Sequence, residues 1–269
     1  MHSRALYDQA IALIDQGLND TDIARRIALP RRTITEWRHG RVPGSRVTGV
    51  TKASRSDRPA WRTDRPGEPC DGCRPPVHDR EAYAYLLGVY LGDGTIDLLR
   101  RGVFSLRITC DLRYPDIVDE IATCVVILKG SERVGFVRRT GCVDVSSYWK
   151  HWACLFPQHG PGRKHDRPIV LRDWQEVIVA AETRSLLRGL IHSDGSRHIN
   201  TVTGRNPAKP KHYRYPRYMF TNASSDILTI FTDALDRLAI HWTRTSPRDI
   251  SVALRADVAF LDTFIGPKE

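Results

Sequence analysis

The feature of this sequence that most limits its fold is an internal duplication in its C-terminal two-thirds. Residues Leu86–Gly94 read LLGVYLGDG, and residues Leu187–Gly195 read LRGLIHSDG. Helix-favouring residues precede each segment, at Glu81–Tyr85 and at Trp174–Leu186. Two strand patterns, an amphipathic helix pattern and two more strand patterns follow each segment. Two copies in the same order predict one structural unit that occurs twice.

The matching elements and the ends of the two copies support this prediction. In the first copy the strands are predicted at 95–98, 103–110, 133–138 and 141–147, with a helix at Pro115–Leu128. In the second they are predicted at 197–203, 213–221, 241–245 and 249–254, with a helix at Ser225–Ala239. Lys164 in Gly-Arg-Lys follows Asp93 by 71 residues, and Lys268 in Gly-Pro-Lys follows Asp194 by 74. The predicted fold class is α+β, a duplicated αββαββα core with pseudo-twofold symmetry.

Composition and periodicity divide the rest of the chain. Residues 1–40 predict a small all-α domain, and residues 41–79 a basic Pro/Gly-rich linker with eight Lys or Arg against five Asp or Glu. The first repeat is expected at 80–172 and the second at 173–269.

Small residues recur every four positions in both duplicated segments, at Gly88 and Gly92 and at Gly189 and Ser193. Residues four apart lie on one face of a helix. We therefore expect two helices whose small faces let their backbones approach unusually closely.

An Asp-Gly pair ends each of these helices. Gly94 and Gly195 are expected to stop the helices in the left-handed conformation, which places Asp93 and Asp194 in the last turns. The helix macrodipole is negative there, and packing of the pair would bring the carboxylates together. A divalent cation would relieve both conflicts, and Mg²⁺ binds through a few carboxylates, phosphate and water. One Asp-Gly would be read as a turn, but two in register predict a metal site.

The nine-residue segments resemble the motif of the LAGLIDADG homing endonucleases, of the two-motif single-chain type, over roughly residues 80–269. The resemblance implies strands that lie in the DNA major groove and motif acids, Asp93 and Asp194, that bind metal at the scissile phosphates. The stretch GPGRKHDRPIVL resembles the family's basic segment. It makes Lys164 the catalytic candidate of the first half and Lys268 that of the second, although each could instead be a solvated surface charge.

The activity that the resemblance implies is site-specific, Mg²⁺-dependent cleavage of both strands of double-stranded DNA by a monomer. This chain departs from the family pattern at the sixth motif position, often Asp, which is Leu91 in one copy and His192 in the other. Arg188 also stands where a small residue is common. The alternative function is a DNA-binding transcriptional regulator on the same scaffold that does not cleave, and a third is nicking by one half.

The N-terminal region has the pattern of a helix-turn-helix. A first helix is predicted at Leu6–Gln16, and Thr21–Trp37 reads as helix, turn and helix, with Thr21 as N-cap and Pro30 at the start of the last helix. The pattern resembles resolvases and repressors, with Ala28 where Gly is usual in the turn. Residues of the last helix expected to contact DNA are Arg31, Arg32, Thr33, Thr35 and Arg38. The alternative is a three-helix bundle that binds protein.

The charge of the chain also favours nucleic acid. Its 41 Lys and Arg against 31 Asp and Glu give a net charge of +10, a balance that attracts polyanions, although a coding bias towards arginine would produce the same excess. A run of basic and aromatic residues near the second repeat's first strand pair adds four candidate DNA-binding residues: Lys209, Lys211, Arg214 and Arg217. Charge that protects an edge strand is the alternative.

The six cysteines predict no disulfide framework, because no apolar segment typical of a secretory signal opens the chain. Cys70 and Cys73 have the spacing of half a zinc site, and the remaining ligands would have to come from elsewhere. The other cysteines are expected in the core: Cys110, Cys124, Cys142 and Cys154. No apolar run approaches the roughly 20 residues of a membrane span, so we expect a cytoplasmic, nucleoid-associated protein.

Overall fold

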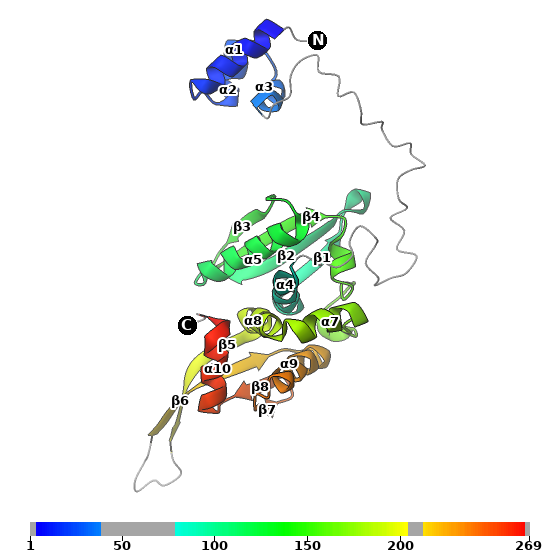
Figure 1. The fold of residues 1–269 in the computed structure, drawn as a ribbon, viewed down its shortest axis with the longest axis vertical. Coiled ribbons are helices and arrows are strands. Elements are labelled where there is room, and N and C mark those ends of the chain that lie inside the picture. The colour runs from blue at the N-terminus through cyan, green and yellow to red at the C-terminus, as the bar shows by residue number, and fades with distance from the viewer. Residues whose placement is uncertain (1–3, 39–78, 204–211, 267–269) are drawn as a thin grey trace. The chain divides into compact units, whose positions relative to one another are not determined.

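The computed structural model describes residues 4–38, 79–203 and 212–266. These form two compact units, a helical unit of residues 4–38 and a core unit of the remaining described residues (Figure 1). Five residues predicted to bind DNA, zinc or phosphate lie outside the described residues: Cys70, Cys73, Lys209, Lys211 and Lys268. None of the helices within the described ranges has the length and apolar character needed to cross a membrane.

The helical unit contains α1 (Arg4–Asp15), α2 (Asp20–Arg26) and α3 (Arg31–Arg38). Its buried apolar residues are Ala10, Leu13, Ile23, Ile27, Ile34 and Trp37. The predicted N-cap at Thr21 is wrong, because the Asn19 side chain accepts hydrogen bonds from the backbone N–H of Thr21 and Asp22, both at 3.0 Å. Ala28 has a φ of 53°, so the turn does take the left-handed conformation that glycine favours.

The core unit consists of two copies of one αββαββα arrangement, which confirms the predicted fold class. The first copy contains α4 (Arg80–Asp93), β1 (Gly94–Leu98), β2 (Phe104–Asp111), α5 (Pro115–Lys129), β3 (Gly135–Arg139), β4 (Cys142–Trp149) and α6 (Trp152–Leu155). After α7 (Asp173–Ala181), the second contains α8 (Thr183–Asp194), β5 (Gly195–Thr203), β6 (His212–Thr221), α9 (Ser225–Arg237), β7 (Thr243–Ser246), β8 (Asp249–Val252) and α10 (Arg255–Ile265). The antiparallel sheets have equivalent orders, β1-β2-β4-β3 and β5-β6-β8-β7.

Helices α4 and α8 lie side by side where the two copies meet (Figure 1). A Cβ atom added to Gly88 would lie 2.5 Å from the carbonyl oxygen of Leu186, and one added to Gly189 would overlap the carbonyl oxygen of Tyr85. The backbones therefore touch without intervening side chains, as the spacing of small residues predicted. Both helices are almost fully buried, and one continuous apolar core joins the two copies.

The predicted left-handed conformation of Gly94 and Gly195 is wrong. Their φ/ψ values are −84°/148° and −96°/166°, which are extended, because each glycine is already the first residue of a strand. The reason for glycine is steric instead. An added Cβ would lie 2.6 Å from the Cα of Tyr90 in the first copy and of Ile191 in the second.

Two smaller expectations are also corrected. The helix expected through Trp174–Leu186 is interrupted at Glu182, and the Thr183 hydroxyl at the start of α8 donates to the Val179 carbonyl at 2.8 Å. Cys110, Cys124 and Cys154 are buried, but Cys142 is only half-buried, because it begins β4.

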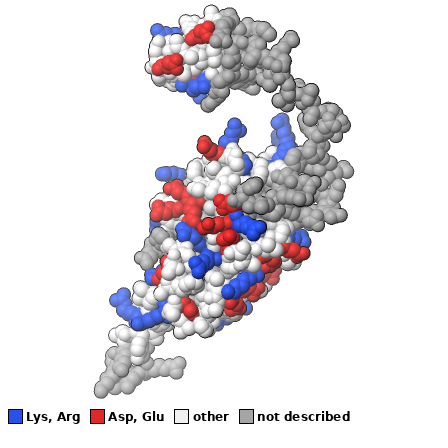
Figure 2. Space-filling model, viewed as in Figure 1, with Lys and Arg blue, Asp and Glu red and all other residues white. Residues whose placement is uncertain are grey.

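Charge is distributed unevenly over the face of the molecule shown in Figure 2. Acidic and basic side chains are interspersed there, and acidic ones gather near the middle of the core unit. Four carboxylates line one cavity together with Arg184 and Arg188: Asp79, Glu81, Glu120 and Glu182. The net positive charge of the chain therefore does not make this face uniformly basic.

We expect Gly189→Ala to lower the free energy of unfolding by about 3 kcal/mol or more, because the new methyl group has no room beside Tyr85. This loss should occur although alanine favours helices by about 1 kcal/mol over glycine. Ser193→Ala, one turn later and without added volume, is the control. Chemical denaturation measures both, and equal stability of Gly189→Ala and the wild type would contradict the close backbone contact.

Candidate functional site

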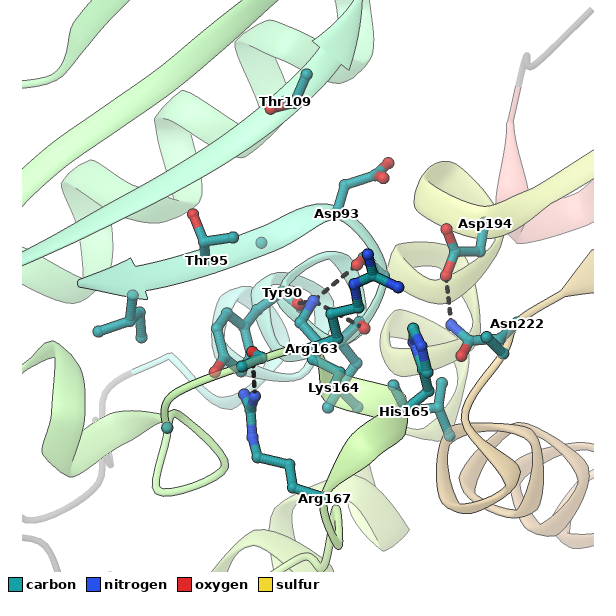
Figure 3. A pocket seen from close by; sticks show the side chains of 18 of the residues that line it. Tyr90, Asp93, Thr95, Thr109, Arg163, Lys164, His165, Arg167, Asp194 and Asn222 are labelled. Carbon is teal, nitrogen blue, oxygen red and sulfur yellow. Dashed lines mark hydrogen bonds between the residues drawn. The ribbon is translucent and has the colours of Figure 1, made fainter.

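A cavity of about 650 Å³ lies at the C-terminal ends of α4 and α8. It brings together three residues that the sequence singled out, Asp93, Lys164 and Asp194. Figure 3 shows Asp93 and Asp194 on opposite sides, with Arg163 and Lys164 between them. Other residues that line it include Tyr90, Thr95, Thr109, His165, Arg167, Thr221 and Asn222.

The two carboxylates reach this cavity because each is the last residue of its helix. The close contact of α4 and α8 brings the two helix ends together, and the strands that begin at Gly94 and Gly195 lead away from them. Both acids thus stand where the helix dipoles are negative. This arrangement favours a cationic partner at the cavity.

Lys164 supplies one such positive charge from the segment after α6. Its Nζ donates to the carbonyl oxygens of Tyr90 at 2.5 Å, Leu91 at 3.0 Å and Gly92 at 2.7 Å. An ammonium group has three N–H donors, so all of them serve the end of α4 in this state (Figure 3). The side chain therefore caps the helix that carries Asp93.

Burial sets the titration of this lysine. It lowers the pKa of Lys164 to about 8, against the attraction of Asp194 and Asp93, while Arg167 lowers the pKa further. Lys164 therefore stays mostly protonated at pH 7, with a neutral fraction of roughly a tenth, far above that of an ordinary lysine.

Arg167 holds the segment that carries Lys164. Its guanidinium donates to the carbonyl oxygens of Gly162 at 2.8 Å and Gln158 at 3.1 Å, and it hydrogen-bonds the Tyr90 hydroxyl (Figure 3). The Lys164 ammonium also lies 5.1 Å from the centre of the Tyr90 ring, within cation–π range. Gly162 and Gly266, the first residues of the two matching end signatures, share a left-handed φ of 77° and 74°.

The two halves of the site differ beside their acids. In the second half the Asn222 amide donates to the Asp194 carboxylate at 2.5 Å. The strand pairs Gly94↔Ile108 and Gly195↔Phe220 make Cys110 the equivalent of Asn222. Burial raises the pKa of Cys110 to about 12, and the Asp93 carboxylate contributes to this, so the thiol stays protonated at neutral pH. The sequence did not identify Asn222, because only the strand register places it beside Asp194.

The donor set of the cavity fits a hard divalent cation. It offers two carboxylates from paired helices, and oxygen ligands suit Mg²⁺. Within the described ranges, no three His, Cys, Asp or Glu side chains cluster to hold a metal. An ion here would therefore need phosphate oxygens or water to complete its coordination.

The α3 residues predicted to bind DNA divide into two groups. Arg31 is exposed and Thr33 half-buried, whereas Thr35 and Arg38 bind Asp20 of α2, each at 2.7 Å. These contacts, the Thr35 hydrogen bond first, lower the pKa of Asp20. The latter pair therefore joins α3 to α2, and DNA contact by this helix remains a prediction. The Arg32 side chain lies outside the described part.

Arg214 and Arg217 of β6 project from opposite faces of the strand, because they are three residues apart. Arg214 is exposed, while Arg217 is half-buried and donates to the Ser251 hydroxyl at 3.0 Å. The two candidate arginines of β6 therefore do not share one surface. The sequence missed Arg163 and His165, which border the cavity, although they flank Lys164 in its basic stretch.

Comparisons with known proteins gave matches among solved structures alone. No protein-family model matches the sequence, and no sufficiently similar curated protein was found. Among solved structures, I-DmoI in complex with DNA and manganese is 16% identical at a TM-score of 0.47, covering 71% of this chain and 99% of its own. The meganuclease I-AabMI bound to uncleaved DNA is 11% identical at a TM-score of 0.45, and the match covers 68% of this chain and 82% of that one. I-WcaI bound to its recognition sequence is 12% identical at a TM-score of 0.45, and the match covers 69% of this chain and 80% of that one.

The solved structures that this chain resembles are LAGLIDADG homing endonucleases. The order of helices and strands in the core unit is the one expected for that fold.

We expect the Lys164 ammonium to titrate near pH 8 in an NMR experiment on protein with labelled lysine side chains, with Lys164→Met to assign the signal. In Asp93→Asn/Asp194→Asn the pKa should fall further, because the attraction of both carboxylates is lost. A pKa near the ordinary 10.5, or no response to the double substitution, would contradict the burial of this group beside the acids.

Proposed function

We propose that this protein is a site-specific endonuclease that cleaves both strands of DNA by metal-dependent phosphodiester hydrolysis. The supporting observation is the meeting of Asp93, Asp194 and Lys164 in one cavity between two equivalent halves. Two acids related by pseudo-twofold symmetry suit a duplex, because its two scissile phosphates are also related by an approximate twofold axis.

Each side chain has a distinct role in this proposal. Asp93 and Asp194 would hold Mg²⁺, which supplies Lewis acidity for the scissile phosphates when bound. Lys164 fixes the end of α4, and so the place of Asp93, and its charge favours an approaching phosphate. Lys268 is the proposed counterpart in the second half. Arg163 and His165 border the same cavity and can contact the DNA backbone.

The helical unit would contribute affinity rather than chemistry. A second DNA-binding unit on the same chain raises the effective concentration of the first contact. Arg31 and Thr33 of α3 are the described candidates for base contact. Phosphate contacts should dominate affinity, so binding should weaken steeply with salt.

One observation favours a second candidate, a DNA-binding regulator that does not cleave. All three donors of Lys164 are used by main-chain carbonyls. A lysine with this role alone would preserve the helix end without taking part in hydrolysis.

The deciding experiment is incubation of the full-length protein with a randomised plasmid library in Mg²⁺, beside the Asp93→Asn/Asp194→Asn variant. We expect discrete double-strand cuts by the wild type and a loss of cleavage of at least about 100-fold in the variant, because its amides are poor ligands for Mg²⁺. DNA affinity, measured by fluorescence anisotropy over a salt series, should remain.

The variant's affinity is the control for folding. Tight, salt-dependent binding by both proteins without cleavage in Mg²⁺ or Mn²⁺ would reject the nuclease and support the regulator. Equal cleavage by both proteins would reject the assignment of the two acids.

A further inference from the structure

A threonine–aspartate pair occurs in both halves of the core unit. The Thr109 hydroxyl donates to the Asp144 carboxylate at 2.8 Å across β2 and β4. The Thr221 hydroxyl donates to the Asp249 carboxylate at 2.6 Å across β6 and β8. In each pair the two residues are direct partners in the strand register. The same side-chain hydrogen bond therefore stands at the same place in two sheets.

The register shows that these positions are equivalent. Ile108 pairs with Gly94, and Phe220 pairs with Gly195. Thr109 and Thr221 each come one residue later, at the strand position next to the end of the motif helix. Their neighbours differ, since Cys110 follows one and Asn222 the other. The pair is therefore the same in both halves, whereas the adjacent residue differs.

Both threonines line the cavity that holds Asp93 and Asp194, and both are exposed. Figure 3 shows Thr109 on the Asp93 side of the cavity. Neither Asp144 nor Asp249 is among the residues that line it. Each threonine thus stands between the cavity and a carboxylate outside it.

The carboxylates keep the hydroxyl protons turned away from the cavity. Asp144 is buried and also accepts from Arg139 at 2.8 Å. Asp249 accepts from Ser246 at 2.5 Å, and the hydrogen bonds from Ser246 and Thr221 lower its pKa. A carboxylate can only accept hydrogen bonds, whereas a hydroxyl donates one and still accepts others. Each threonine oxygen therefore remains available to accept a hydrogen bond.

We propose that Thr109 and Thr221 are positioning residues, one for each DNA strand, that each accept a hydrogen bond from the water molecule that attacks the phosphate. Asp144 and Asp249 fix the direction of the two hydroxyls. This inference rests on the proposed nuclease function. A water held in line with the phosphorus atom reacts faster because its orientation is set before the reaction.

The competing explanation is purely structural, since cross-strand hydrogen bonds stabilise sheets. It predicts that loss of either pair lowers stability without a preference for one DNA strand. The positioning role predicts the opposite, a strand-specific loss of rate in a stable protein.

The test uses the full-length protein and a supercoiled plasmid that carries the site selected by the wild type. Thr109→Val removes the hydroxyl in one half, and Thr221→Val removes it in the other. We expect each variant to cut one strand at least about 10-fold more slowly than the wild type and to accumulate nicked plasmid. The two variants should spare opposite strands on a denaturing gel with both strands labelled.

Serine variants and aspartate variants test the hydroxyl itself. Thr109→Ser and Thr221→Ser should restore cleavage to within about 2-fold of the wild type. Asp144→Asn and Asp249→Asn should act like the valine variants, because an amide can donate to the threonine oxygen and turn its proton into the cavity. The matched controls are Thr123→Val on α5 and Thr229→Val on α9, exposed threonines whose hydroxyls donate to carbonyl oxygens of their own helices, and these should cut normally.

Two measurements do not depend on cleavage. DNA affinity and the unfolding temperature of Thr109→Val and Thr221→Val should match those of the threonine controls. A crystal structure with uncleaved DNA should show a water within hydrogen-bonding distance of each threonine oxygen, and its loss in the valine variants.

The outcomes are distinct. If the wild type cuts but a valine variant slows cleavage of both strands equally, the positioning role is overturned. It is also overturned if a loss of DNA affinity accounts for the slower cleavage by the variant. Absence of cleavage by the wild type would reject the proposed function, and this inference with it.

Discussion

The backbone contact between α4 and α8 determines most of the other features of the core unit. Because Gly88 and Gly189 carry no Cβ, each helix lies directly against main-chain atoms of the other. This contact joins the two repeats into one apolar core. It also sets how near the two helix ends come, so the separation of Asp93 and Asp194 follows from a packing constraint several residues away. The site is thus a consequence of the interface between the repeats.

Such an interface has an electrostatic cost. Two helix C-termini and two carboxylates converge, and each contributes negative charge. Lys164 offsets part of it by donating to three carbonyls at the end of α4. To make these bonds the Lys164 side chain is withdrawn from solvent, and this burial lowers its pKa to about 8. A cation bound between the acids would offset the same negative charge that stabilises the Lys164 ammonium. The protonation of Lys164 is therefore coupled to whatever occupies the cavity.

The sequence predicted those parts of the fold that depend on local pattern. The duplication and the close helix pair follow from spacing, whereas the place of Lys164 beside Asp93 and Asp194 was implied by the resemblance of its segment to the family's basic segment. The role of Gly94 was predicted wrongly, because a helix that passes directly into a strand ends without a left-handed residue. Asn222 and the two threonines beside the acids were missed, since only the register of paired strands shows which residues are neighbours. Register is a tertiary property, and a single strand pattern does not contain it.

The same register also shows that a symmetric scaffold carries two different sets of residues beside its acids. Thr109 and Thr221 are the same residue in the two copies, whereas Cys110 and Asn222 differ. Asn222 directly binds its motif acid, while the buried thiol of Cys110 stays neutral beside its own. The two acids therefore have different surroundings although their helices are equivalent. Under the proposed function, each half of the protein would meet its own phosphate in a duplex whose half-sites differ in sequence, so the residues beside each acid could differ independently. Residues that both phosphates would require are then expected to be identical in the two halves, as the motif acids and the threonine–aspartate pairs are.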